Sequence, residues 1–297
     1  MKWEGVIPAM TTPFLEDGAI DEAFVRRHVD AFVKAGCTGV VALGSLGEGG
    51  GLSGDEKTTL LRAAHEGLAG RAPLVAGIAA LSTAEARALA REAEHCGCAG
   101  LMVLPPYVYA SDWREMRAHV QAVLRATRLG CMLYNNPPAY RTDFLPEQID
   151  ELAGEHPNLV AVKESSGDAR RVTAIKARCG DRLAIFAGLD DMAVEGVRAG
   201  AVGWIAGLVN AFPRETAALF RHAVRGETAQ ADALYRWFLP LLRMDVVPKF
   251  VQLIKLVQQE VGMGNERVRG PRLVLAGAER EAALATLKAA LAARPAR

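Results

Sequence analysis

Asn158-Leu-Val-Ala-Val-Lys163-Glu-Ser-Ser-Gly-Asp168 combines a short apolar run, a lysine and a turn. The run has no polar alternation, which predicts a strand buried on both faces. The turn and Asp168 predict the start of a following helix. Lys163 therefore stands at the carboxyl end of a buried strand. Burial lowers the pKa of a lysine and favours the neutral amine that attacks carbonyl carbons.

A lysine in this position also has a purely structural interpretation. Its ammonium group could extend to solvent, or it could pair with the adjacent Glu164. Structural lysines are commoner than catalytic ones, so this stretch alone does not decide between the two interpretations.

The same alternation of an apolar run and an amphipathic helix recurs about eight times along the chain. The predicted strands cover residues 6–10, 39–43, 73–77, 100–104, 131–134, 159–163, 183–187 and 202–206. Such a repeat predicts an α/β fold, a (β/α)8 TIM barrel. Three more helices are predicted near residues 228–242, 247–262 and 278–293. We therefore expect a barrel in residues 1–226 and a helical extension packed on it in residues 227–297.

Composition excludes several classes of function. Lys+Arg 35 against Asp+Glu 34 leaves no basic excess, so neither nucleic acid nor a membrane surface is an expected partner. The five cysteines form no disulfide or zinc pattern, and no signal peptide or membrane span is apparent, so we expect a cytoplasmic protein. None of the six histidines falls at a strand end, so neither a metal nor a cofactor is expected.

Unusual residues follow the predicted strands, and in a barrel those loops form one face. A glycine-rich loop, Gly44-Ser-Leu-Gly-Glu-Gly-Gly-Gly51, follows the second strand. The fourth, fifth and seventh strands are followed by Tyr107, Tyr134 and Asp190-Asp191. Their convergence with Lys163 on one face favours a catalytic lysine.

These residue types suit the chemistry of 2-oxo acids. A neutral lysine condenses with such an acid to an iminium, which is an electron sink for cleavage, dehydration or deamination. Tyr134 is placed to carry the proton, and Ser45 and Tyr107 are the available hydroxyl partners. Backbone N–H groups near Ser45 and Leu46 would receive the substrate carboxylate. Glu48 is expected to cap the next helix rather than to act in catalysis.

The patterns Gly44-Ser-x-Gly-Glu48, Tyr134-Asn-x-Pro137 and Val162-Lys163, at these separations, resemble the dihydrodipicolinate synthase / N-acetylneuraminate lyase family over nearly the whole chain. The resemblance implies a Schiff base on Lys163 and a proton shuttle at Tyr134. It implies that Ser45 binds carboxylate, that Tyr107 completes the relay in the neighbouring subunit's site, and that the Ile205 carbonyl lines the site. It also implies a homotetramer that is a dimer of dimers.

Several positions depart from the family pattern. Leu46 replaces the second hydroxyl of the family loop, and Ala139 stands where the synthases hold the arginine that grips aspartate semialdehyde. Arg141, two residues on, is a possible substitute. Trp204 and its neighbours after the eighth strand are too apolar for a long polyol tail. Asp190 is retained as a candidate substrate-binding residue.

These departures favour a smaller 2-oxo acid or a cyclic imino acid as substrate. The double asparagine after Tyr134 resembles catabolic family members, notably deaminases of 1-pyrroline-4-hydroxy-2-carboxylate. A 2-oxo acid aldolase or hydratase-aldolase, and 4-hydroxy-tetrahydrodipicolinate synthase, remain alternatives. So does a non-catalytic protein that binds a 2-oxo acid, although a mere binder needs no proton relay.

Overall fold

Eight parallel strands close into a barrel in the computed structural model, which describes residues 1–106 and 109–295. The strands are β1 (Gly5–Pro8), β2 (Val40–Ala42), β3 (Leu74–Ile78), β4 (Gly100–Val103), β5 (Gly130–Asn135), β6 (Leu159–Glu164), β7 (Ala184–Ala187) and β8 (Gly203–Ala206). Neighbours in sequence pair in parallel from β2 to β8, and β8 pairs with β1. Backbone hydrogen bonds from Thr38 to Val6 and from Met10 to Val41, both 2.8 Å, join β1 to β2. The predicted TIM barrel is confirmed.

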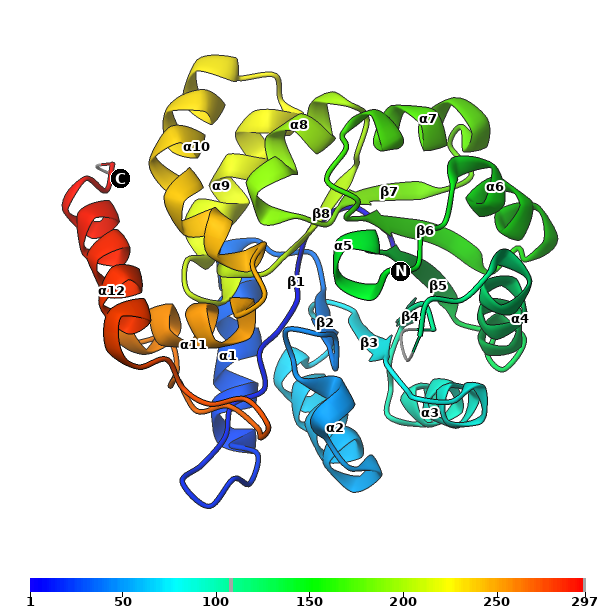
Figure 1. Cartoon of the computed structure of the whole chain (residues 1–297), viewed down its shortest axis with the longest axis horizontal. Coiled ribbons are helices and arrows are strands. Elements are labelled where there is room, and N and C mark those ends of the chain that lie inside the picture. The colour runs from blue at the N-terminus through cyan, green and yellow to red at the C-terminus, as the bar shows by residue number, and fades with distance from the viewer. Residues whose placement is uncertain (107–108, 296–297) are drawn as a thin grey trace.

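Helices alternate with the strands, and most of them cover the outside of the barrel (Figure 1). They are α1 (Glu22–Ala35), α2 (Gly54–Leu68), α3 (Thr83–His95), α4 (Trp113–Leu124), α5 (Pro137–Tyr140), α6 (Pro146–Glu155), α7 (Arg170–Cys179), α8 (Ala193–Arg198) and α9 (Pro213–Val224). Local signals set their ends. Ser53 and Glu56 form a reciprocal capping box at α2, as the sequence suggests. The helix predicted after Asp168 begins at Arg170, whose backbone N–H donates to the Asp168 carboxylate.

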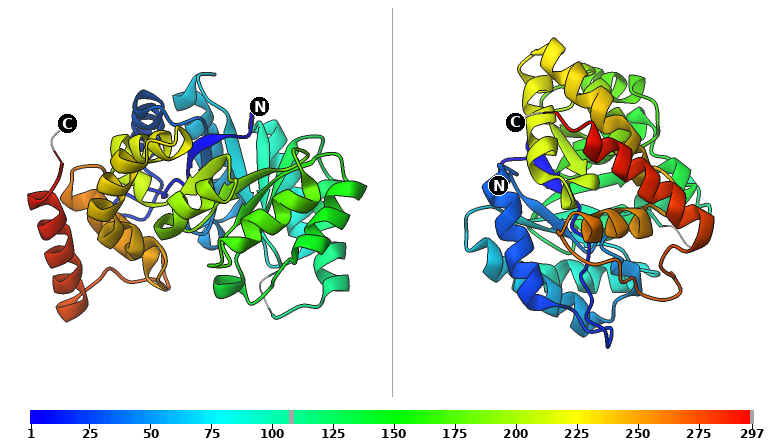
Figure 2. Two further views of the ribbon diagram at one scale, coloured as in Figure 1. Left: turned by 90° about the horizontal axis from the view of Figure 1, so that it is seen from above. Right: turned by 90° about the vertical axis from the view of Figure 1, so that its left-hand side faces the viewer.

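Three C-terminal helices lie together on one side of the barrel (Figures 1 and 2). They are α10 (Thr228–Leu242), α11 (Phe250–Glu260) and α12 (Gly277–Ala292). Helix α10 packs on α9 and α12, and α11 packs on the 3-10 turn that follows β8. The chain between α10 and α11 therefore passes close to the end of β8.

A buried ion pair fastens this C-terminal extension to the glycine-rich loop. Lys255 of α11 donates to the Glu48 carboxylate over 2.7 Å, and the backbone N–H of Arg269 donates to the same carboxylate over 2.8 Å. Both charged side chains are almost completely buried. Glu48 makes no capping hydrogen bond, so the expectation that it caps the next helix is wrong. It ties the extension to the loop that carries Ser45.

Lys255→Met is expected to lower the free energy of unfolding by about 3 kcal/mol, because it leaves the Glu48 carboxylate buried without its cation. Lys249→Met is the matched control, since Lys249 pairs with Glu279 at the surface. That change should cost no more than about 1 kcal/mol. Thermal unfolding followed by circular dichroism measures both. Equal shifts of the midpoint for the two variants would contradict a structural role for the buried pair.

Candidate active site

Lys163 lies inside the barrel mouth at the end of β6, in register with Tyr134 on β5 and Phe186 on β7. The residue is 7% exposed, and its Nζ lies 4.0 Å from the centroid of the Tyr134 ring. Glu164 follows on the opposite face of the strand and accepts hydrogen bonds from Asn135 Nδ2 and the Ser166 backbone N–H, at 3.0 and 2.6 Å. The ammonium group therefore neither reaches solvent freely nor pairs with Glu164, which removes both structural interpretations.

Burial lowers the pKa of Lys163 below its usual 10.5. Three neighbours raise the pKa and stabilise the ammonium form; in decreasing order of effect they are Asp245, Tyr140 and Asp190. Burial outweighs them, so a larger fraction of the amine is neutral at a given pH than in an exposed lysine. A neutral amine in this position can attack a carbonyl or imine carbon.

The rate of adduct formation with pyruvate is expected to rise with pH and to reach half its maximum below 10.5, because the attacking amine has a lowered pKa. Asp245→Asn should move this midpoint to still lower pH, since it removes a negative charge that holds the proton on Lys163. Mass spectrometry after borohydride trapping at a series of pH values measures the midpoint. Asp232→Asn, whose carboxylate pairs with Arg198 at the surface, should leave it unchanged. A midpoint at or above 10.5 in the unmodified protein would contradict the prediction.

Tyr134 is surrounded by polar side chains. Asn136 Nδ2 donates to its hydroxyl over 2.8 Å, and the Tyr140 ring meets its ring edge-on at 5.7 Å between centroids. Burial raises the pKa of Tyr134 to about 12, while Asn136, Ser165 and Tyr140 lower it slightly. Ser165 lies near this hydroxyl, yet its own buried oxygen has no hydrogen-bond partner among the described residues. The phenol therefore holds its proton at neutral pH and can donate it to an atom bound at Lys163.

The two asparagines after Tyr134 have different tasks. Asn135 donates to Asp143, Glu164 and the Phe144 carbonyl and accepts from the Phe144 backbone N–H, so it fixes the loops after β5 and β6. Asn136 instead faces the Tyr134 hydroxyl and accepts from the Ala139 backbone N–H. Only the second asparagine contacts the candidate proton carrier.

The loop after β2 is wound tightly enough to strain its backbone. Leu43 and Glu48 have φ values of 64° and 55°, which non-glycine residues rarely adopt. A Cβ at Gly49 would lie 2.0 Å from the Leu43 carbonyl oxygen, so only glycine fits there. Strain of this kind collects at functional sites. In the described part of the chain no group accepts from the backbone N–H of Ser45 or Leu46, which leaves both for an anionic ligand.

The Ser45 hydroxyl contacts the hydroxyl of Tyr140 at the end of α5. Tyr107, the partner expected for Ser45, lies outside the described residues. Tyr140 was not anticipated from the sequence, although its place six residues after Tyr134, beyond a proline pair that turns the chain, is the signal that could have identified it. Hydroxyl groups thus link the loop after β2 to Tyr134.

The remaining candidate residues lie in different surroundings. Leu46 and Ile205 are buried, the latter within β8. Ala139 and Arg141 are exposed around α5, and Arg141 forms no ion pair with any described residue. Asp190 is fully buried and accepts hydrogen bonds from Trp204 Nε1 and from the backbone N–H groups of Gly207 and Leu208, at 2.9, 3.0 and 2.7 Å. Burial raises its pKa to about 6.

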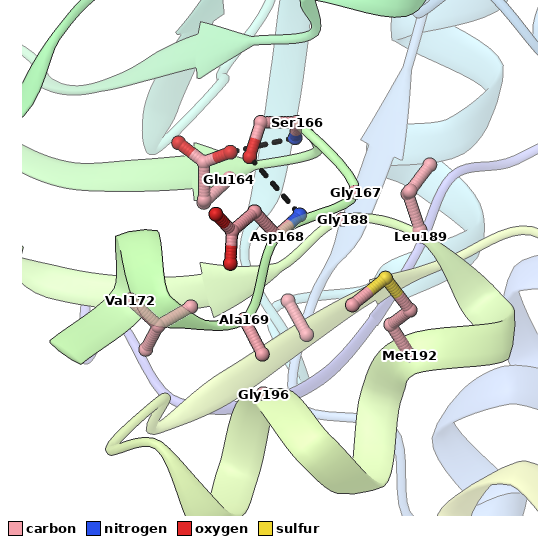
Figure 3. Close-up of a pocket in the computed structure, with 11 residues that line it drawn as sticks. Glu164, Ser166, Gly167, Asp168, Ala169, Val172, Gly188, Leu189, Met192 and Gly196 are labelled. Carbon is pink, nitrogen blue, oxygen red and sulfur yellow. Dashed lines mark hydrogen bonds between the residues drawn. The ribbon is translucent and has the colours of Figure 1, made fainter.

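A small cavity of about 20 Å³ lies beside the strand that carries Lys163 (Figure 3). Its walls come from the loop after β6, the start of α7 and the segment after β7. Ser166 bridges Glu164 and Asp168 along one wall. The volume suits about one water molecule, so this cavity does not hold the substrate.

The described residues contain no group of three or more His, Cys, Asp or Glu side chains placed to hold a metal ion. Within the same part of the chain, each helix is too short or too polar to span a membrane.

Known proteins resemble this chain over nearly its whole length, including the residues of the site. The model of the dihydrodipicolinate synthetase family matches residues 2–290. The 4-hydroxy-tetrahydrodipicolinate synthase of Halorhodospira halophila is 34% identical and covers 94% of this chain and 94% of that protein. The protein of the same name from Xanthomonas axonopodis pv. citri is 36% identical over 95% of this chain and 93% of its own. The chloride-inhibited dihydrodipicolinate synthase of Acinetobacter baumannii, complexed with pyruvate, has a TM-score of 0.92 at 28% identity and covers 97% of this chain and 99% of its own.

Proposed function

This chain belongs to the dihydrodipicolinate synthetase family and is an enzyme of that lyase and aldolase family, and from this premise we propose that it forms a Schiff base through Lys163 with a small 2-oxo acid or cyclic imino acid. We propose as its reaction the deamination of 1-pyrroline-4-hydroxy-2-carboxylate. The observation that supports the Schiff base is the buried Lys163 Nζ, 4.0 Å from the ring of a tyrosine that keeps its proton. A related synthase has been solved with pyruvate, a small 2-oxo acid.

The first step is attack by the neutral Lys163 amine on the C2 carbon. With a 2-oxo acid, Tyr134 protonates the departing oxygen and water is released. With a cyclic imine, the C2–N bond of the ring breaks instead, and the ring nitrogen takes the proton and becomes an amine. In both cases the Lys163 nitrogen becomes an iminium that withdraws electrons from the neighbouring carbon.

The substrate carboxylate is assigned to the loop after β2. The backbone N–H groups of Ser45 and Leu46 and the Ser45 hydroxyl provide donors there, and hydrogen bonds to a charged acceptor are the stronger kind. Leu46 offers no side-chain hydroxyl, so recognition at this position depends on the backbone. We assign Asp190 the task of holding the turn after β8, because its carboxylate already receives donors from that turn.

Tyr140 is expected to pass protons between Ser45 and Tyr134, since it contacts the first and packs on the second. Tyr140→Phe should lower turnover about tenfold, the effect of losing one hydrogen bond worth about 1.4 kcal/mol in the transition state. Steady-state kinetics measure the change, and thermal unfolding checks that the variant is folded. Unchanged turnover would show that the proton reaches Tyr134 by another route.

A second candidate, 4-hydroxy-tetrahydrodipicolinate synthase, is favoured by the names of the relatives described above. It requires a cation that grips the carboxylate of aspartate semialdehyde. Ala139 cannot supply one, and Arg141 is exposed in a left-handed backbone conformation, φ 57°. Asp190 and Asp245 place two carboxyl groups near Lys163, which suit an amino or hydroxyl group better than a second carboxylate.

Parallel assays distinguish these functions. Ammonia release from 1-pyrroline-4-hydroxy-2-carboxylate tests the deaminase, and condensation of pyruvate with aspartate semialdehyde tests the synthase. Pyruvate with aromatic aldehydes tests the aldolase and hydratase-aldolase alternative. Adduct formation without any turnover would support a 2-oxo acid binding protein, and absence of ammonia release would reject the deaminase.

The family resemblance also favours a homotetramer, a dimer of dimers, in the cytoplasm. Analytical ultracentrifugation of the purified chain should give about four times the mass of one chain, 31.7 kDa. A monomer would reject this assembly, and a monomeric dihydrodipicolinate synthase variant is known among the solved structures.

A further inference from the structure

Asp245 brings a carboxylate from the C-terminal extension to the barrel mouth. It ends a 3-10 turn, η4 (Arg243–Asp245), which follows α10 and packs on η2 (Asp190–Met192), the turn after β7. Its carboxylate lies directly against Gly207, the first residue after β8, where an added Cβ would lie 2.1 Å from Asp245 Oδ1. The carboxylate therefore lies at the end of β8, and the residue is partly exposed there.

Two carboxylates thus meet at the same turn after β8, but their surroundings differ. Asp190 is satisfied by Trp204 and by two backbone N–H groups. Asp245 receives no hydrogen bond from any described residue, and among the acids its charge acts most strongly on Lys163. The buried Ser165 hydroxyl, also without a partner in the described part of the chain, lies against Gly188 after the adjacent β7. Unused polar groups from two loops therefore lie near Lys163.

We propose that Asp245 is the acid that protonates the leaving hydroxyl group on the carbon two bonds from the Schiff base carbon. This inference rests on the proposed function, because it requires a substrate bound to Lys163. When the substrate carboxylate is bound by the loop after β2, the far end of the substrate lies elsewhere in the mouth. At the Gly207 turn, the Asp245 carboxyl group has no hydrogen-bond partner among the described residues. A hydroxyl or amino group there would provide the missing donor.

Tyr134, which has given its proton to the departing group in the first step, takes a proton from C3 of the iminium, and an enamine forms. Its nitrogen electron pair then shifts to re-form the iminium, the C2=C3 electrons become C3=C4, and the C4–O bond breaks. The departing oxygen keeps the bond electrons and takes the proton from the Asp245 carboxyl group, so that water leaves. Asp245 recovers its proton from solvent before the next turnover.

The surroundings of Asp245 favour the protonated carboxyl group that this step needs. Burial is the main cause that raises its pKa well above its usual 3.8, and the nearby carboxylates of Asp190 and Asp191 raise it further. Lys163 from β6 is the opposing charge, and its nitrogen is neutral in the enamine from which the hydroxyl group departs. Tyr134 faces the same carboxylate, which raises the pKa of the phenol.

Asp245→Asn in the full chain tests the proposal with three measurements. Borohydride-trapped pyruvate on Lys163 reports Schiff base formation, deuterium exchange at the pyruvate methyl group reports the enamine, and product analysis reports elimination. We expect the adduct and the exchange to be no more than about threefold below those of the unmodified protein, while kcat for the hydroxylated imino acid or a 4-hydroxy-2-oxo acid falls at least about 100-fold. Asp232→Asn on α10, which pairs with Arg198 at the surface, should leave all three unchanged.

A 4-chloro-2-oxo acid provides a second readout, because chloride departs without a proton. Asp245→Asn should eliminate chloride at close to the rate of the unmodified protein, which a structural defect would not allow. The proposal is overturned if hydroxyl elimination stays within threefold, if adduct formation falls in parallel with turnover, or if the unmodified protein eliminates neither hydroxylated substrate. Failure of the unmodified protein to form any adduct would instead reject the proposed function itself.

Discussion

Replacing Lys163 with alanine is expected to abolish the pyruvate adduct and to lower turnover by about 10⁵-fold or more, the scale of loss when a covalent nucleophile is removed. The effect should be this large because the iminium is the only electron sink that the described part of the site offers. Tyr134, Ser45 and Tyr140 can bind substrate and move protons, but none of them can withdraw electrons from the carbon next to C2. Lys163→Ala should therefore still bind 2-oxo acids weakly.

The measurement is the mass of the Lys163 peptide after borohydride reduction with pyruvate, together with steady-state kinetics. Lys176→Ala is the matched control, because Lys176 pairs with Asp181 at the surface of α7. It should keep both the adduct and the turnover. An adduct that survives in Lys163→Ala, or turnover within tenfold of the unmodified protein, would remove Lys163 from the mechanism.

Tyr134→Phe is expected to retain some Schiff base but to lower turnover by about 10²-fold to 10⁴-fold, the usual contribution of a positioned general acid or base. The ring that packs under Lys163 Nζ remains, so the amine keeps its place and its lowered pKa. What disappears is the hydroxyl that holds its proton at neutral pH and receives a hydrogen bond from Asn136. Proton transfer at the imine then depends on water.

The loss should appear in kcat more than in KM, because the proton moves in the transition state. Tyr235→Phe is a suitable control. Tyr235 lies on α10 and its hydroxyl is hydrogen-bonded to the Asp191 carbonyl, so loss of this hydroxyl tests stability rather than proton transfer. Thermal unfolding of both variants separates folding from catalysis. Near-normal turnover of Tyr134→Phe would exclude Tyr134 as the proton carrier.

The fold could be predicted from the sequence because its signals are local. Each strand of the barrel is buried on both faces, so its sequence is a continuous apolar run such as Leu159 to Val162. Capping residues such as Ser53 mark where helices start. Parallel strands of one barrel end on one face, which is enough to place the ends of β2, β5 and β6, and with them Ser45, Tyr134 and Lys163, at a common mouth.

Other parts of the site depend on contacts between segments that are distant in sequence. Glu48 and Lys255 are separated by 207 positions, and no local pattern indicates that one neutralises the other. Ser45 and Tyr140 are 95 positions apart, and their contact depends on how α5 turns back over the mouth. The double asparagine is visible in the sequence, but the division of tasks between Asn135 and Asn136 follows from opposite side-chain directions at the end of β5.

The sequence by itself determined the barrel and the lysine at the end of its sixth strand, and it predicts Schiff base chemistry for that lysine. Only the tertiary structure decided the environment of that lysine. Burial of Lys163, the position of Asp245 against Gly207 and the unpartnered Ser165 hydroxyl result from packing between strands, loops and the C-terminal extension. The physical reason is that strand and helix formation depends on residues a few positions apart, whereas the charge state of a buried group depends on every group that packing brings within a few ångströms.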